Sequence, residues 1–164
     1  MAFLNEFDHE MRQTRRLLER VPDDRLDFRP HPRSKTLGAL ALHVAGIPSW
    51  TSNLLGEASY DLAPDLASKD RERALPGDRA EILGVFDASV ARARAHIAAQ
   101  SEETLKTKWS LMRGGETVVT LPRAAVLRQF LMNHLVHHRG QLTVYLRMLD
   151  IPVPALYGPS ADED

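Results

Sequence analysis

Apolar residues recur at helical spacing in four stretches of the chain. Between residues 3 and 21 they lie three or four positions apart, and Pro22 is expected to end this first helix. Ser34 or Thr36 can cap a second helix, and Pro48 predicts a kink within it. The pattern therefore predicts that the chain begins with two amphipathic helices, joined by a connection that is rich in proline.

A long connection, residues 56–77, separates the second helix from the third. It shows little periodicity, and we expect at most one helical turn, near Leu66. Asp78 and Glu81 resemble a capping box that starts a third helix, and Pro122 suits the first turn of a fourth. A crossover of this length allows neighbouring helices to run parallel.

One stretch breaks the helical pattern. Residues 109–113 and 116–120 are β-prone and flank Gly114 and Gly115, which predicts a short hairpin or flap before the fourth helix. No other stretch predicts a sheet. We therefore expect an all-α fold, a four-helix bundle with a long crossover between helices 2 and 3, forming a single domain over residues 1–164.

Composition narrows the function classes. Hydrophobic residues make up 43% and charged residues 26% of the chain, which indicates a globular protein. The net charge of -1 predicts no nucleic-acid partner, and no apolar run is long enough for a signal peptide or a membrane span. We expect a cytoplasmic protein. There is no cysteine, so any metal must be held by His, Asp, Glu or water.

The histidines suggest a metal site. His134 and His138 lie one turn apart on one face of the fourth helix, and His43 lies in the apolar stripe of the second. A buried imidazole without a partner costs about 1–3 kcal/mol, so a divalent ion would account for all three. We predict that His43, His134 and His138 are metal ligands with open positions left for other ligands. Hydrogen-bonded core histidines are the alternative; His137 could compete with His138, and the role of His96 is left open.

Five further side chains are candidates for the site or its surroundings. Gln141 and Tyr145 lie on the ligand face of the fourth helix and could orient ligands or substrate, or simply form helix contacts. Trp50 is expected to be part of a pocket wall or of the core, in preference to a platform for substrate. Arg139 points away from His134 and is expected to pair with an acidic residue. Glu10 is a candidate general base, although a surface role is the stronger expectation.

Two helices and the C-terminal tail share a pattern that is typical of one family. Its residues are His43 and Trp50, the run 133–141 (Asn-His-Leu-Val-His-His-Arg-Gly-Gln), and the tail segments 152–154 and 157–160. Through them, nearly the whole chain resembles the DinB/YfiT-like group of metalloenzymes. The resemblance implies a four-helix bundle that is often dimeric. It also implies that the three histidines hold nickel or zinc, with iron or manganese as alternatives.

The resemblance also implies an activity. Family members of known activity are similar to thiol-dependent transferases and isomerases that use bacillithiol, mycothiol or glutathione. We therefore expect a transferase in which the metal activates a low-molecular-weight thiol toward a small-molecule substrate. The alternatives are a hydrolase that generates hydroxide on the metal, and a non-catalytic metal-binding stress protein. A homodimer is the expected assembly, with no nucleic acid or membrane as partner.

Overall fold

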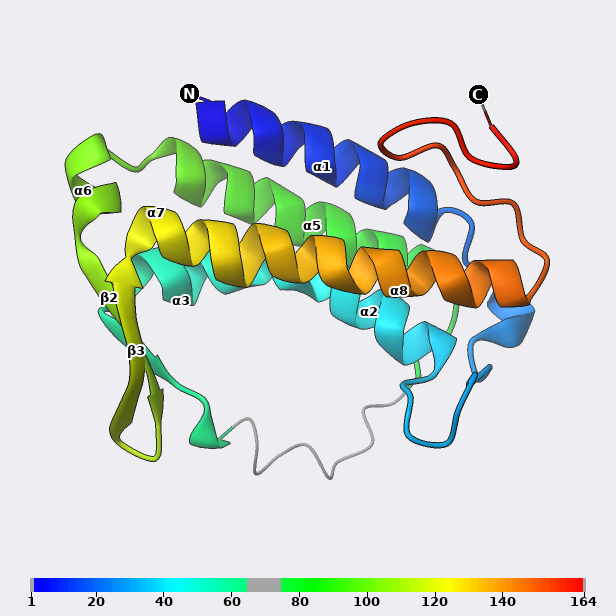
Figure 1. Ribbon diagram of the computed structural model, residues 1–164, viewed down its shortest axis with the longest axis horizontal. Coiled ribbons are helices and arrows are strands. Elements are labelled where there is room, and N and C mark those ends of the chain that lie inside the picture. The colour runs from blue at the N-terminus through cyan, green and yellow to red at the C-terminus, as the bar shows by residue number, and fades with distance from the viewer. Residues whose placement is uncertain (1, 65–74, 164) are drawn as a thin grey trace.

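The computed structural model describes residues 2–64 and 75–163, and within them helical segments form four rods (Figure 1). The rods are α1 (Ala2–Leu18); α2 (Leu37–Gly46) with η2 (Ile47–Trp50) and α3 (Thr51–Gly56); α5 (Arg79–Ala98); and α7 (Arg123–Val126) with η3 (Leu127–Asn133) and α8 (His134–Met148). Two short helices, η1 (Asp23–Arg25) and α6 (Glu102–Lys106), lie in connections. The turn expected near Leu66 lies outside the described residues.

The starts of the second and third rods follow the sequence signals. Thr36, and not Ser34, caps α2 by accepting a hydrogen bond from the Ala39 backbone N–H at 3.2 Å. Asp78 caps α5 by accepting from the Glu81 N–H at 2.8 Å, whereas the Glu81 carboxylate accepts from the Gly77 N–H at 2.7 Å. In a complete capping box the Glu81 carboxylate would accept from the N–H of Asp78. Here it accepts from the preceding residue, Gly77, so only the first of the two bonds has the expected partner.

Pro48 changes the second rod without ending it. The chain passes from α2 into the 3-10 helix η2, with the proline in its first turn, and then continues as α3. Proline lacks a backbone N–H and cannot make the normal helical bond, so a local change of helix type at this point has a direct cause. His43 lies on α2, ahead of the change.

The prediction of an all-α fold is wrong, because three strands form a mixed sheet. They are β1 (Ser59–Asp61), β2 (Lys108–Arg113) and β3 (Glu116–Pro122), in the order β1-β2-β3. β2 and β3 are antiparallel, and the turn between them contains Gly114 and Gly115 at φ of 60° and 83°, values that glycine adopts without strain. β1 pairs parallel with β2.

β1 is the strand that sequence reasoning missed. It has three residues and lies in the crossover, where no alternating pattern marks it. Its strand geometry comes from pairing with β2, about fifty residues further along the chain, and tertiary pairing of this kind overrides weak local preference. The Asp61 carboxylate strengthens the attachment by accepting from the N–H groups of Gly114 and Gly115 at 2.9 Å each.

The core lies between the rods, where α2 contacts both α5 and α8 and where α1 contacts α5 and α8. The C-terminal tail folds back over α1 (Figure 1). Ion pairs hold this end of the chain: Glu163 bonds to Arg16 and Arg20, and Asp162 bonds to Arg147. Among the described helices, none has the length and apolar character needed to cross a membrane.

Candidate metal centre

The structure brings three histidines from two rods together. His43 comes from α2, and His134 and His138 come from α8, one turn apart. One ring nitrogen of each lies within 4.8 Å of the others. The ring of His138 is 4.5 Å from those of both His43 and His134, measured between centroids. All three side chains are half-buried, so the cluster is reachable from solvent.

The spacing of the donor atoms fits a metal ion. Nε2 of His43 and Nε2 of His134 are 3.2 Å apart. Two imidazole nitrogens bound tetrahedrally at 2.0–2.1 Å from zinc would be separated by about 3.3 Å. Nδ1–H of His138 donates to Oε1 of Gln141 at 2.8 Å, which leaves Nε2 of His138 as its donor to an ion.

Burial favours the neutral form of His134 and His138, which is the form that binds a metal. Burial lowers the pKa of His134 to about 4, and the charges of His138 and His137 act in the same direction. Burial also lowers the pKa of His138; the hydrogen bond that His138 donates to Gln141 opposes this, while the charges of His137 and Lys35 add to it. These two side chains therefore offer lone pairs instead of protons at neutral pH.

No carboxylate joins the histidines within the part of the chain that the structure describes. An ion held by three neutral imidazoles would keep its full charge. It would also keep open coordination positions, since three protein ligands are the pattern of catalytic sites and four that of structural ones. Half-buried Trp50 bounds the cluster on one side, with its ring 4.9 Å from that of His134 and 5.8 Å from that of His43.

Comparison with known proteins assigns the chain to a family. The model of the DinB family matches residues 1–164 of the chain. The protein belongs to the DinB family.

Two kinds of relative agree with this assignment. The chain is 31% identical over 167 residues to the uncharacterized protein YrdA of Bacillus subtilis, covering 98% of this chain and 89% of that protein. Solved structures of two DinB-like proteins share the fold. One, from Bacillus cereus, has a TM-score of 0.72 at 23% identity, covering 94% of this chain and 95% of the other. The other, YjoA of Bacillus subtilis, has a TM-score of 0.71 at 19% identity, covering 97% and 100%.

The remaining candidates fall into different places in this DinB-family protein. Gln141 bridges two histidines, because its Nε2 donates to Nε2 of His137 at 3.1 Å while its Oε1 holds His138. His137 itself is exposed and outside the cluster. The Tyr145 hydroxyl donates to the Lys35 carbonyl oxygen at 3.1 Å, which is a contact between α8 and the loop before α2. His96 lies 3.4 Å from Thr51 Oγ1, apart from the cluster.

Glu10 does not belong to the histidine cluster. The expected surface role is also wrong, because Glu10 is only 7% exposed and its carboxylate bonds to Arg139 at 2.6 Å. The prediction that Arg139 pairs with an acidic residue is confirmed. The helical pattern places Glu10 at the edge of the apolar stripe of α1. Only the packing of α8 against α1 shows that the buried guanidinium of Arg139 lies beside it.

Two features near the site had no clear signal in the sequence. The segment η3 is π-helical and ends at Asn133, directly before His134. Wider turns of this kind are frequent at functional sites. The second feature is Lys35, whose positive charge contributes to lowering the pKa of His138 although the two residues are about a hundred positions apart in the sequence.

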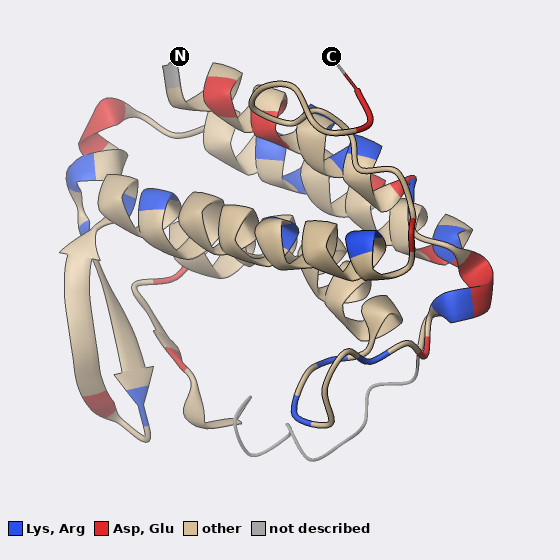
Figure 2. Cartoon of the chain, turned by 45° about the vertical axis from the view of Figure 1, so that its right-hand side comes forward, with Lys and Arg blue, Asp and Glu red and all other residues tan. Residues whose placement is uncertain are grey.

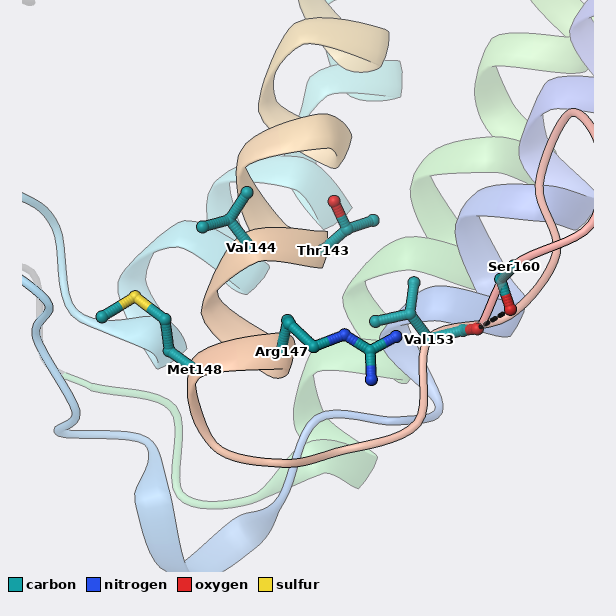
Figure 3. Close-up of a pocket in the computed structure, with 6 residues that line it drawn as sticks. All are labelled: Thr143, Val144, Arg147, Met148, Val153 and Ser160. Atoms are coloured by element: carbon teal, nitrogen blue, oxygen red, sulfur yellow. Dashed lines mark hydrogen bonds between the residues drawn. The ribbon is translucent and has the colours of Figure 1, made fainter. Parts of the chain in front are cut away.

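A surface hollow of about 320 Å³ lies elsewhere, between the end of α8 and the C-terminal tail (Figure 3). Val144 and Met148, which are 56% and 54% exposed, form one side. On the other, the Ser160 hydroxyl donates to the Val153 carbonyl oxygen at 2.8 Å. None of the histidines lines this hollow, so it is separate from the candidate centre.

Proposed function

We propose that the protein is a divalent-metal-dependent transferase that activates a low-molecular-weight thiol toward a small electrophilic substrate. His43, His134 and His138 hold the ion, for which nickel and zinc are the first candidates. The observation that carries the proposal is a cluster of three imidazoles with no carboxylate beside them among the described residues, in which burial lowers the pKa of His134 to about 4. A bound divalent ion supplies positive charge that lowers the pKa of a thiol, so that the thiolate is available at neutral pH.

The residues of the chain provide the setting for this chemistry. Gln141 fixes the tautomer of His138 through its bond to Nδ1. The ring of Trp50 lies against the rings of His43 and His134 on one side. The chain has no cysteine, which agrees with a thiol that arrives as a small molecule.

A metal-dependent hydrolase is the second candidate. Three histidines with open positions also form the ligand set of zinc enzymes that activate water. Hydrolases of this class commonly use a nearby carboxylate as general base, and the one that the sequence suggested, Glu10, is held by Arg139. The transferase is therefore the stronger proposal.

Metal loading tests the ligand set. The purified protein is loaded separately with zinc, nickel, iron or manganese, desalted, and measured by elemental analysis. His43→Ala and His138→Ala are expected to lose nearly all bound metal, while His9→Ala, an exposed histidine on α1, retains it. Full metal retention in both ligand variants would rule out the site.

Thiol consumption tests the reaction. The metal-loaded protein is incubated with chlorodinitrobenzene and a panel of thiols, and thioether formation is followed by absorbance. We expect consumption above background that disappears in His43→Ala and after removal of the metal. If no thiol is consumed but simple esters are cleaved in a metal-dependent way, the hydrolase replaces the transferase as the proposed function. If neither occurs, a binding role remains.

A further inference from the structure

A second surface hollow lies between α3 and α5, away from the histidine cluster. Its volume is about 230 Å³, and the residues that line it are Ser52, Leu55, Gly56, His96 and Gln100. This volume would hold roughly seven water molecules, so there is room for a small organic ligand. None of the three clustered histidines is among the lining residues, so the hollow is separate from the candidate metal centre.

The hydrogen bonds of Thr51 decide which nitrogen of the neutral His96 ring carries the hydrogen. The Thr51 hydroxyl donates its single hydrogen to the Pro48 carbonyl oxygen at 3.0 Å. Its oxygen also lies 3.4 Å from Nδ1 of His96, where it can therefore only accept. Nδ1 is thus the donor nitrogen of His96, and Nε2 keeps its lone pair. This half-buried side chain brings a hydrogen-bond acceptor to the hollow.

Two other lining side chains also use a donor on a backbone carbonyl group. The Ser52 hydroxyl donates to the Ser49 carbonyl oxygen at 3.0 Å, and Nε2 of Gln100 donates to the His96 carbonyl oxygen at 2.9 Å. The Ser52 oxygen keeps lone pairs, and Gln100 keeps Oε1 as an acceptor. With Nε2 of His96, three acceptors belong to the side chains of one hollow, beside the apolar side chain of Leu55.

The described residues that line this hollow include no Lys, Arg, Asp or Glu. The whole second rod, from Leu37 to Gly56, contains none of these residue types and is tan along its length in Figure 2. Partial charges of the backbone therefore contribute much of the local electrostatic potential. The C-terminal end of a helix carries partial negative charge, which favours a cation there.

Two helices end at the hollow. α5 has 20 residues and ends at Ala98, with His96 in its last turn, and α3 ends at Gly56. At the end of α3 the buried guanidinium of Arg123 already bonds to two backbone carbonyl oxygens. The longer helix, α5, is therefore the main source of negative potential that is left for a ligand.

We propose that this hollow binds the primary ammonium group of a small molecule. An alkylammonium ion has three N–H donors, and the hollow has three side-chain acceptors, on His96, Ser52 and Gln100. The alkyl chain lies against Leu55. A metal ion suits the hollow less well, because the described lining residues include no carboxylate and a single imidazole. The proposal is independent of the proposed function, since the two sites share no residue.

Titration with butylammonium, followed by NMR, tests the proposal. The full-length ¹⁵N-labelled protein is freed of metal with a chelator and titrated at about pH 7.5, where an alkylamine is protonated as lysine is. We expect saturable shifts of the Ser52, Gly56 and Gln100 signals, with a dissociation constant on the order of 1 mM for so small a ligand. The signal of Val144, in the other hollow, should stay in place. Absence of saturable shifts at the lining residues would refute the proposal.

Three probes of similar size identify what is recognised. Butanol has no charge, butyltrimethylammonium has the charge but no N–H donor, and butyrate has the opposite charge. We expect each to bind at least about tenfold more weakly than butylammonium, because hydrogen bonds from charged donors contribute most. If butanol or butyltrimethylammonium binds as tightly as butylammonium, recognition does not depend on a charged donor and the proposal is wrong.

Substitutions locate the binding to the proposed acceptors. His96→Ala should weaken butylammonium binding about tenfold, and Ser52→Ala about threefold. Ser52 is exposed on a helix, where alanine is well tolerated, so this variant decides the matter if His96→Ala does not fold. His31→Ala, an exposed histidine in the loop before α2, is the control and should bind like the wild-type protein. Unchanged affinity in Ser52→Ala, or in folded His96→Ala, would overturn the proposal.

Discussion

Neighbouring residues of α8 serve two polar regions of opposite character. His138 turns into the histidine cluster, which is half-buried and has no carboxylate partner in the described part of the chain. Arg139, the next residue, is 1% exposed and bonds to the Glu10 carboxylate at 2.6 Å. A helix turns by about 100° per residue, so adjacent positions face different surroundings.

The Arg139 cluster is closed and fully bonded. Besides the carboxylate, the guanidinium donates to the Glu10 carbonyl oxygen and the Thr14 hydroxyl, at 3.1 Å each, and to the Tyr157 hydroxyl. The Tyr157 hydroxyl in turn donates to Glu10 at 2.8 Å, and burial together with this bond raises the pKa of Tyr157. These bonds join α1, α8 and the C-terminal tail.

The two regions show how buried polarity can serve either the fold or a ligand. In the Arg139 cluster every charge has its partner, which is the condition for a buried ion pair to be tolerated. In the histidine cluster burial, together with the neighbouring charges, lowers the pKa of His134, so this side chain stays in the neutral form that a metal ion can bind. The first arrangement holds the chain together, and the second is suited to a metal ion.

Removing Arg139 should have the largest effect on stability. Arg139→Ala leaves the Glu10 carboxylate buried without its partner, and we expect a loss of about 3–5 kcal/mol in the free energy of unfolding, measured with urea. Arg12→Ala, an exposed arginine on α1, should change it little. If Arg139→Ala does not fold, Tyr157→Phe offers a milder test, with an expected loss of about 1 kcal/mol. If the free energy of unfolding of Arg139→Ala equals that of the wild-type protein, the Arg139 cluster does not stabilise the fold and the contrast with the histidine cluster fails.

Removing Gln141 should affect the metal and not the fold. Gln141→Ala takes away the acceptor for His138 Nδ1–H, and we expect metal affinity to fall about 10- to 100-fold, measured by competition with a chelating dye. Gln141→Glu keeps an acceptor oxygen and should restore most of the affinity. Gln129→Ala, exposed on the preceding π-helical segment, is the control. A drop in unfolding free energy without a change in metal affinity would assign Gln141 to the fold.

Acid should weaken the metal-free protein through His134. The pKa of His134 is about 4 in the folded state against 6.5 for an ordinary histidine, so between these values the unfolded chain binds more protons. Stability is therefore full above about pH 6.5, falls as the pH is lowered, and stops falling from this cause below about pH 4. Because the side chain is half-exposed, the slope should stay below about 1.4 kcal/mol per pH unit.

The variant His134→Asn removes this titration and should flatten the pH profile of unfolding in the metal-free protein. The measurement is the urea midpoint at a series of pH values, with His9→Ala as the control for an exposed histidine. A profile that keeps the same slope in His134→Asn would show that other groups govern the acid response.

Local patterns were sufficient for several elements of this protein. Helical spacing in the sequence predicted the rods, and Gly114 with Gly115 predicted the hairpin turn, because each depends on neighbours in the chain. The four-residue spacing placed His134 and His138 on one face for the same reason. The local pattern did not reveal β1, whose partner strand is distant in sequence, and the all-α expectation failed there.

The sequence by itself determined which residues share a helix face, and therefore that α8 presents two histidines together. Only the tertiary structure decided which faces meet. It brought His43 to that pair, set Glu10 against Arg139, and joined the loop before α2 to α8 through Tyr145. The physical reason is that helix periodicity follows from bonds between neighbouring residues, whereas the pairing of helices depends on how all their side chains pack together.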